Sequence, residues 1–146
     1  MKKFFLAAAL LFAGITASQA DNNDRPITLD KLPAAAQNFL KSHFSDLTLA
    51  YAIEEPQYIG SEYEVTYTDR TEVEFDSKGE WTTVDRKYAA VPASIVPKQI
   101  SDYVAKTFAG QMIYKIDRDR YTWEIELSNG LEVKFDKDFR VIGIDD

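Results

Sequence analysis

The sequence predicts an α+β fold of two tandem repeats, each a helix with a short helical lead-in followed by about four antiparallel strands, with the helices on one face of the sheet. Three observations lead to this prediction. A strand–turn–strand segment occurs twice in register, as TEVEFDSKGEWTTVD at residues 71–85 and LEVKFDKDFRVIGID at residues 131–145. Apolar residues at helical spacing precede each copy. Between helix and copy, apolar residues recur at every second position.

The first twenty residues have the pattern of a signal peptide. Lys2 and Lys3 precede an apolar run, and Ser18 and Ala20 supply the small residues that a signal peptidase recognises. The apolar run is shorter than the roughly 20 residues that span a bilayer. We therefore expect residues 1–20 to be removed after Ala20 and the chain to be periplasmic or secreted. The two repeats are then residues 21–87 and 88–146.

Each repeat is expected to open with an amphipathic helix that begins at a proline, Pro33 in the first and Pro97 in the second. Proline is tolerated in the first turn of a helix, where its missing N–H has no partner to lose. The apolar positions of both segments fall on one helical face. They are Leu32, Ala36, Phe39, Leu40 and Phe44 in the first repeat and Val96, Ile100, Tyr103, Val104 and Phe108 in the second.

The strands follow in the same order in both repeats. Alternation places Leu49, Tyr51 and Ile53 together on one side of the first strand, and Met112, Tyr114 and Ile116 on one side of its equivalent. Three more strands are expected near residues 63–67, 73–75 and 81–84, with equivalents near 123–127, 131–135 and 141–144. A unit of this size buries too little surface to be stable alone, so the repeats should pack together or share one sheet.

A hairpin turn fixes which residues face each other. Ser128-Asn129-Gly130 is a plausible three-residue turn, and it pairs Ile125 with Val133 on the buried side. The same register in the first repeat pairs Val65 with Val73. The opposite side then carries facing carboxylates, which repel each other across the strands. Glu64 faces Glu74 and Glu126 faces Glu132, with Glu72 and Glu124 beside them.

The charge balance favours a cationic partner for this side of the sheet. The chain carries a net charge of −7, and removal of Lys2 and Lys3 would make it −9. Such a charge repels nucleic acids and anionic membranes. The six glutamates Glu64, Glu72, Glu74, Glu124, Glu126 and Glu132 are candidates for binding a basic protein or peptide. The alternative is a solvated sheet face whose charges are screened by salt.

Few residues could support catalysis or hold a cofactor. The chain has no cysteine and one histidine, His43, and no glycine-rich phosphate loop, so we expect no enzyme and no cofactor apart from possible calcium. Candidate calcium ligands are Asp76, Asp136 and Asp138, which lie in acidic turns. Their spacing does not match an EF-hand loop, and turn formation alone also explains aspartate at these positions.

The motifs of the chain resemble those of the PepSY-like exported proteins of Bacteroides-type bacteria. The resemblance lies in LPAAAQNFLKSHF and YEVTYTDRTEVEFDSKGEW, repeated as VPKQISDYVAKTF and WEIELSNGLEVKFDKDFRVI. It implies a fold similar to the beta-lactamase inhibitory protein, in whose relatives an open sheet face grips a partner, and a link to restraint of peptidases in the cell envelope. Phe139 replaces the turn glycine Gly79, so the repeats need not bind alike.

These observations together predict an exported, non-enzymatic binding module. Its partner would be a protein or basic peptide of the cell envelope, and its role that of an inhibitor or regulator of an envelope hydrolase or peptidase. Neither nucleic acid nor a membrane span after signal cleavage is expected. Two alternatives stay open: a calcium-responsive periplasmic protein and a structural accessory protein.

Overall fold

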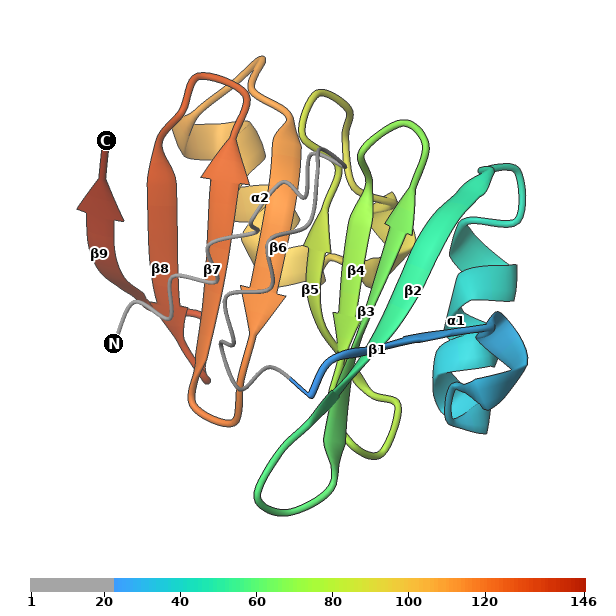
Figure 1. The fold of residues 1–146 in the computed structure, drawn as a ribbon. Coiled ribbons are helices and arrows are strands. Elements are labelled where there is room, and N and C mark those ends of the chain that lie inside the picture. The colour runs from blue at the N-terminus through green and yellow to red at the C-terminus, as the bar shows by residue number, and fades with distance from the viewer. Residues whose placement is uncertain (1–22) are drawn as a thin grey trace.

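A computed structural model describes residues 23–146, so the predicted signal peptide and its cleavage site lie outside the described residues. The described chain is α+β, with two α-helices and nine strands (Figure 1). The elements of the first half are β1 (Arg25–Ile27), a 3₁₀ turn (Leu29–Lys31), α1 (Ala34–His43), β2 (Leu49–Pro56), β3 (Ser61–Tyr67), β4 (Glu72–Phe75) and β5 (Trp81–Asp85). Those of the second half are a 3₁₀ turn (Ala93–Ile95), α2 (Lys98–Thr107), β6 (Ile113–Arg118), β7 (Thr122–Leu127), β8 (Glu132–Asp136) and β9 (Val141–Asp145).

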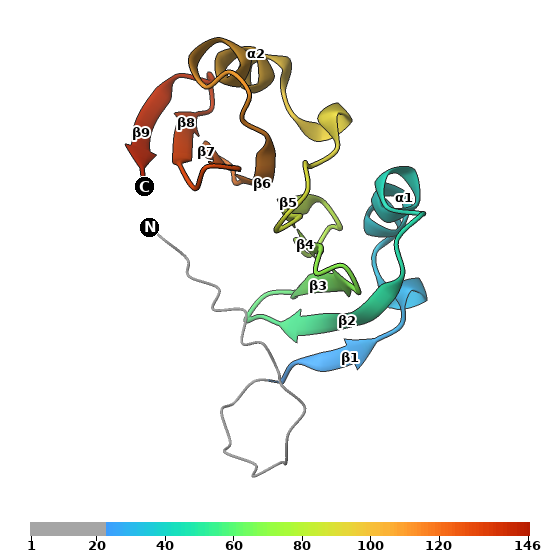
Figure 2. The same ribbon diagram turned by 90° about the horizontal axis from the view of Figure 1, so that it is seen from above.

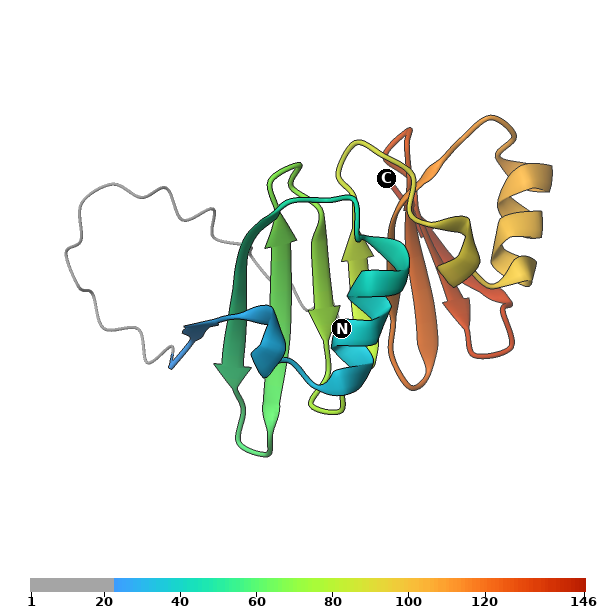
Figure 3. The ribbon, with the colours of Figure 1, turned by 90° about the vertical axis from the view of Figure 1, so that its right-hand side faces the viewer.

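All nine strands form one antiparallel sheet in chain order, from β1 at one edge to β9 at the other. The two halves join where β5 pairs with β6, with Val84 opposite Ile116. This pairing confirms that one sheet continues through the molecule. Both helices lie on the same side of the sheet, as the view along it in Figure 2 and the side view in Figure 3 show. The other side carries no helix among residues 23–146.

The hydrophobic core lies between the helices and the sheet. Ala36 and Leu40 of α1 and Ile100 and Val104 of α2 are buried, as the helical spacing predicts. Each helix begins directly after its proline, and the extended conformation of Pro33 and Pro97 starts the first turn. Since the chain has no cysteine, burial of these apolar side chains takes the place of covalent cross-links.

The predicted hairpin registers are confirmed. Val65 lies opposite Val73, and Ile125 lies opposite Val133, with all four side chains in the core. The turn glycine Gly130 has a φ of 88°, a left-handed conformation that glycine adopts without strain. The register therefore follows from the turn and from the need to bury one side of each strand.

The prediction for the inner side of the first strand was wrong by one residue. Ala52, not Tyr51 or Ile53, faces the core opposite Val65, and it is 2% exposed while Tyr51 is 44% exposed. The cause is a β-bulge between Leu49 and Tyr51, which shifts every later side chain to the other side.

The same irregularity occurs in β6, between Ile113 and Lys115. Here Ile116 lies in the core as predicted, whereas Met112 is exposed. Because the bulge recurs at the equivalent place, Ala52 is the counterpart of Ile116. A count of alternating positions that ignores the bulge instead matches Ile53 with Ile116.

The turns before β5 and β9 differ because the helix contacts them differently. A Cβ at Gly79 would lie 2.8 Å from the Pro33 Cβ and 3.0 Å from the Ala36 N, so only glycine fits against α1. Phe139 takes the equivalent place in the second half with a φ of 62°. Its ring packs on Trp123, with 5.8 Å between ring centroids, and adds to the core instead.

Candidate functional site

The open side of the sheet carries two rows of side chains that cross the strands from β2 to β9. We name them after their β4 members. The Glu74 row consists of Ile53, Glu64, Glu74, Thr83, Asp117, Glu124, Lys134 and Gly143. The Glu72 row consists of Tyr51, Thr66, Glu72, Asp85, Lys115, Glu126, Glu132 and Asp145. Together the two rows form what we call the open face.

All six glutamates predicted from the sequence lie in these rows. Glu64 is opposite Glu74, Glu126 is opposite Glu132, and Glu124 is opposite Lys134, as expected. The structure adds acidic residues that the sequence reasoning missed, namely Asp85, Asp117 and Asp145, and the lysine Lys115. The sequence did contain a signal for two of them. Asp85 directly follows Val84 and Asp117 directly follows Ile116, so alternation places each aspartate on the side opposite a core residue.

Among the carboxyl groups of the open face, Glu74 has the largest rise in pKa. Partial burial raises the pKa of Glu74 to about 7, and the negative charges of Glu64 and Asp117 add to the rise. Burial also raises the pKa of Glu64, to which the charge of Glu72 contributes. Within residues 23–146, neither Glu64 nor Glu74 forms an ion pair with a lysine, arginine or histidine.

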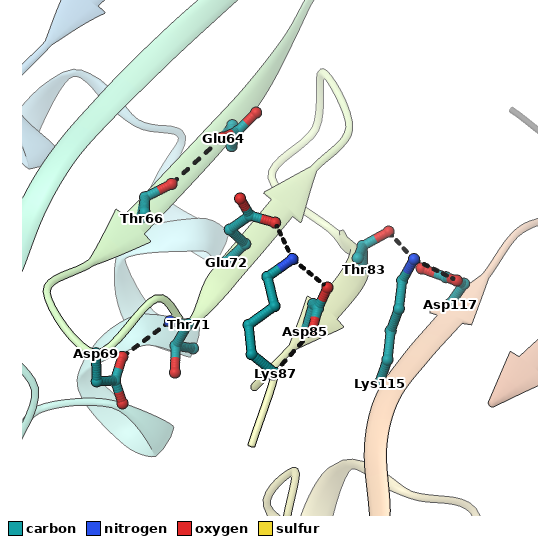
Figure 4. Close-up of polar contacts among 10 residues, drawn as sticks. All are labelled: Glu64, Thr66, Asp69, Thr71, Glu72, Thr83, Asp85, Lys87, Lys115 and Asp117. Atoms are coloured by element: carbon teal, nitrogen blue, oxygen red, sulfur yellow. Dashed lines mark hydrogen bonds and ion pairs between the residues drawn. The ribbon is translucent and has the colours of Figure 1, made fainter. Parts of the chain in front are cut away.

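Asp117 extends this acidic row across the junction of the halves. The Thr83 hydroxyl donates a 2.7 Å hydrogen bond to its Oδ1, and the Lys115 Nζ lies 3.6 Å from its Oδ2 (Figure 4). Burial nevertheless outweighs the neighbouring lysine and raises the pKa of Asp117. Glu64, Glu74 and Asp117 thus form a partly desolvated line of carboxylates.

Lys87 neutralises part of the other row. It follows β5 with a φ of 59°, and its Nζ donates to the Asp85 Oδ2 at 2.7 Å and to the Glu72 Oε2 at 3.1 Å (Figure 4). Burial alone would lower the pKa of Lys87, but the two carboxylates outweigh it and raise the pKa. Lys87 therefore pairs with two carboxylates of the Glu72 row. Among residues 23–146, no lysine or arginine pairs with Glu64 or Glu74 in the Glu74 row.

The second half of the open face is also acidic but is mixed with lysine. Burial raises the pKa of Glu124, with the charges of Glu132 and Asp117 adding to it. Burial likewise raises the pKa of Glu126, helped by Asp85 and opposed by Lys115. The negative charge is therefore least compensated in the first half, around Glu64 and Glu74.

The candidate calcium ligands lie outside the two rows, in or beside the turns before β5 and β9. The Asp76 Oδ1 accepts backbone hydrogen bonds from Lys78 at 2.9 Å and Glu80 at 3.0 Å. The Asp136 Oδ1 accepts the equivalent bonds from Asp138 at 2.9 Å and Arg140 at 3.0 Å. These carboxylates stabilise the turns. No group of three or more potential metal ligands occurs in the part of the chain that the structure describes.

No helix within residues 23–146 has both the length and the apolar character needed to cross a membrane. The open face is a strongly charged sheet surface. Charged surfaces of this kind steer and select oppositely charged partners.

Comparison with solved structures identifies proteins with the same fold. A "putative periplasmic protein" of the DUF2874 family from Bacteroides vulgatus has 44% identity and a TM-score of 0.83, over 88% of this chain and 100% of that one. A "putative calcium-regulated periplasmic protein" from Bacteroides thetaiotaomicron has 42% identity and a TM-score of 0.83, with the same coverage. A second Bacteroides vulgatus protein, a "putative periplasmic protein of unknown function", has 37% identity and a TM-score of 0.79, over 84% of this chain and 99% of that one.

The comparison with curated proteins finds no match. One protein family, described as "Putative beta-lactamase-inhibitor-like, PepSY-like", matches residues 18–66 and 61–143. These two matches cover most of the chain, including both helices and nearly all of the sheet. The chain therefore belongs to this PepSY-like, beta-lactamase-inhibitor-like family.

Proposed function

We propose that this protein is an exported, non-enzymatic binding module whose open face binds a positively charged segment of a protein or peptide in the cell envelope. One observation carries the proposal: the partly buried line Glu64, Glu74 and Asp117 has raised pKa values, and no cation pairs with its two glutamates among residues 23–146. A fold gains no stability from carboxylates held in this way. A bound lysine or arginine would supply the missing charge.

Export is supported by the signal-like first twenty residues and by the periplasmic descriptions of similar proteins. Inhibition or regulation of an envelope hydrolase or peptidase is supported by the description of the family. The repeated order of a helix and four strands supports our division of the chain into repeats at residues 21–87 and 88–146. Both lysines of the two rows, Lys115 and Lys134, lie in the second half, which favours the first repeat as the larger contributor to binding a cationic partner.

The test compares two variants of equal net charge. In the first, Glu64, Glu74, Glu126 and Glu132 are all changed to glutamine. In the control, the exposed residues Asp30, Asp46, Glu80 and Asp102, which lie outside the two rows, are changed to the corresponding amides. Immobilised natural protein should capture basic envelope proteins and a defined lysine- and arginine-rich peptide, and capture should weaken as salt is added.

The control variant should retain most of this capture, whereas the open-face variant should lose it. Equal capture by both variants would mean that overall charge, not the open face, governs binding. The proposal would then fail. Equal capture by the natural protein and the open-face variant would reject it as well.

A second candidate function is calcium-responsive behaviour, which is favoured by the description of the Bacteroides thetaiotaomicron relative. The candidate ligands are Asp76, Asp136 and Asp138. The turn hydrogen bonds described above use only the Oδ1 atoms of Asp76 and Asp136, and the Asp138 carboxylate accepts none of them. A ligand that binds only the native state must raise the melting temperature. Melting in millimolar calcium, compared with magnesium and with chelator, tests this, and an unchanged melting temperature would reject it.

A further inference from the structure

The last strand, β9, is an uncovered edge of the sheet. It pairs only with β8, so the backbone groups on its outer side have no strand partner among residues 23–146. Its apolar side chains are also exposed, Ile142 by 56% and Ile144 by 50%. An edge strand that is both apolar and unpaired is a ready template for another strand.

The opposite edge of the sheet differs in both respects. β1 has only three residues, and Pro26 at its centre has no backbone N–H to donate. Arg25 beside it forms an ion pair with Glu54 at 3.3 Å, which adds charge to this edge. A short strand with proline and charge resists further pairing. Head-to-tail addition of one molecule's β9 to another's β1 is therefore disfavoured.

The molecule itself contains a precedent for pairing at the outer edge of β9. The counterpart of β9 in the first half is β5, which follows the equivalent turn and pairs on its inner side with β4. The outer side of β5 is not free, because β6 pairs with it in antiparallel orientation. The same kind of strand thus accepts an antiparallel neighbour where the chain supplies one.

The sequence around β9 is complementary to itself when two copies run antiparallel about Gly143. In this register Ile142 of each copy faces Ile144 of the other, so the exposed apolar side chains cover each other. Arg140 of each copy faces Asp146 of the other, which places opposite charges together. A register centred on Ile142 would instead place Asp138 opposite Asp146, and one centred on Ile144 would place Ile142 opposite Asp146.

We propose that the outer edge of β9 binds β9 of a second copy of this chain, in antiparallel orientation and centred on Gly143. The contact is isologous, so it closes as a symmetric dimer and does not grow into a filament. The two-fold axis runs through the sheet, so the open faces of both copies lie on the same side of one continuous sheet. This inference does not depend on what the open face binds.

The first test is the mass of the purified protein in solution, by sedimentation equilibrium. At about 100 µM, even a dimer with a Kd of about 10 µM is mostly assembled. We expect twice the monomer mass for the natural protein. Ile142→Lys should weaken the dimer about tenfold or more, because it places a charge against an isoleucine. Ile59→Lys, at a still more exposed residue of the β2–β3 turn, should leave it intact.

Two further variants test the register. Arg140→Asp should weaken the dimer, and the double variant Arg140→Asp with Asp146→Arg should restore it, because the opposed charges are exchanged. The chain has no cysteine, so Gly143→Cys introduces a single thiol. A Cβ at Gly143 has no neighbour closer than the Lys134 Cβ at 3.9 Å, so the substitution fits. Facing strands bring the two Cα atoms within disulfide range.

Under mild oxidation Gly143→Cys should give a covalent dimer, while Ile59→Cys should stay largely monomeric. A monomeric natural protein at about 100 µM together with no cross-linking of Gly143→Cys would overturn the proposal. A dimer that Ile142→Lys leaves unchanged would overturn it too, since the contact would then lie elsewhere. If charge exchange fails to restore a dimer weakened by Arg140→Asp, the Gly143-centred register is wrong.

Discussion

Replacing Glu74 with glutamine should make the protein more stable at neutral and alkaline pH. The pKa of Glu74 rises from its ordinary value of 4.5 to about 7 in the folded protein, mainly because of burial and then because of Glu64 and Asp117. The folded state therefore holds this proton more tightly than the unfolded state. Stability from the protonated form is fully present below about pH 4.5 and is lost as pH rises through about 7.

The size of the effect follows from the shift. One pKa unit corresponds to about 1.4 kcal/mol, so between pH 5 and pH 8 the ionisation of Glu74 lowers the free energy of unfolding by about 2 to 3 kcal/mol. The raised pKa values of Glu64, Glu124 and Glu126 act in the same direction. Carboxyl groups with lowered pKa values, such as Asp69, stabilise the folded protein when ionised, and this stabilisation is lost only at more acidic pH.

The assay is urea unfolding at pH 5, 6, 7 and 8, followed by tryptophan fluorescence. Glu74→Gln should match the natural protein near pH 5 and exceed its free energy of unfolding by about 2 to 3 kcal/mol at pH 8. Asp46→Asn removes the same charge from an exposed site and should follow the natural profile. A natural protein as stable at pH 8 as at pH 5, or a Glu74→Gln variant less stable than it at pH 8, would refute the reasoning.

Three further tests, one of them with a matched control, examine other parts of the structure by the same unfolding measurement. Lys87→Met should cost about 1 to 2 kcal/mol at pH 8, because two carboxylates lose their shared cation; an unchanged stability would show that the bridge is not formed. Gly79→Ala should lower the free energy of unfolding by about 2 to 4 kcal/mol, because its methyl group would collide with Pro33. Gly130→Ala meets open space and should lower it by only about 1 kcal/mol. Equal losses would contradict the close approach of α1 to Gly79. Phe139→Ala should cost about 2 kcal/mol through lost packing, and a gain would mean that backbone strain dominates there.

The hairpins could be predicted from the sequence because local rules determine them. The turn at Gly130 fixes one register, and the alternation of large apolar residues fixes which side is buried. The inner side of β2 could not be predicted in this way. Ala52 is a weak apolar signal beside the larger Tyr51, and a bulge leaves no mark of its own in the sequence.

The residues of the candidate site also differ in whether local sequence rules could predict them. The six glutamates were predicted because each belongs to a hairpin whose strands are close in sequence. The contact of Thr83 with Asp117 joins residues 34 positions apart, across the pairing of β5 with β6. No turn connects those two strands directly, so their register depends on how the second helix packs. Lys87 was missed because its role depends on a left-handed backbone conformation after β5.

The junction between β5 and β6 also has a consequence for how the chain folds. β5 is complete at Asp85, but the strand that pairs with its outer edge begins only at Ile113. Until β6 docks, the first half exposes an unpaired strand edge. Asp85 and Glu72 beside it are charged residues of the kind that discourage mispairing with other unfolded chains.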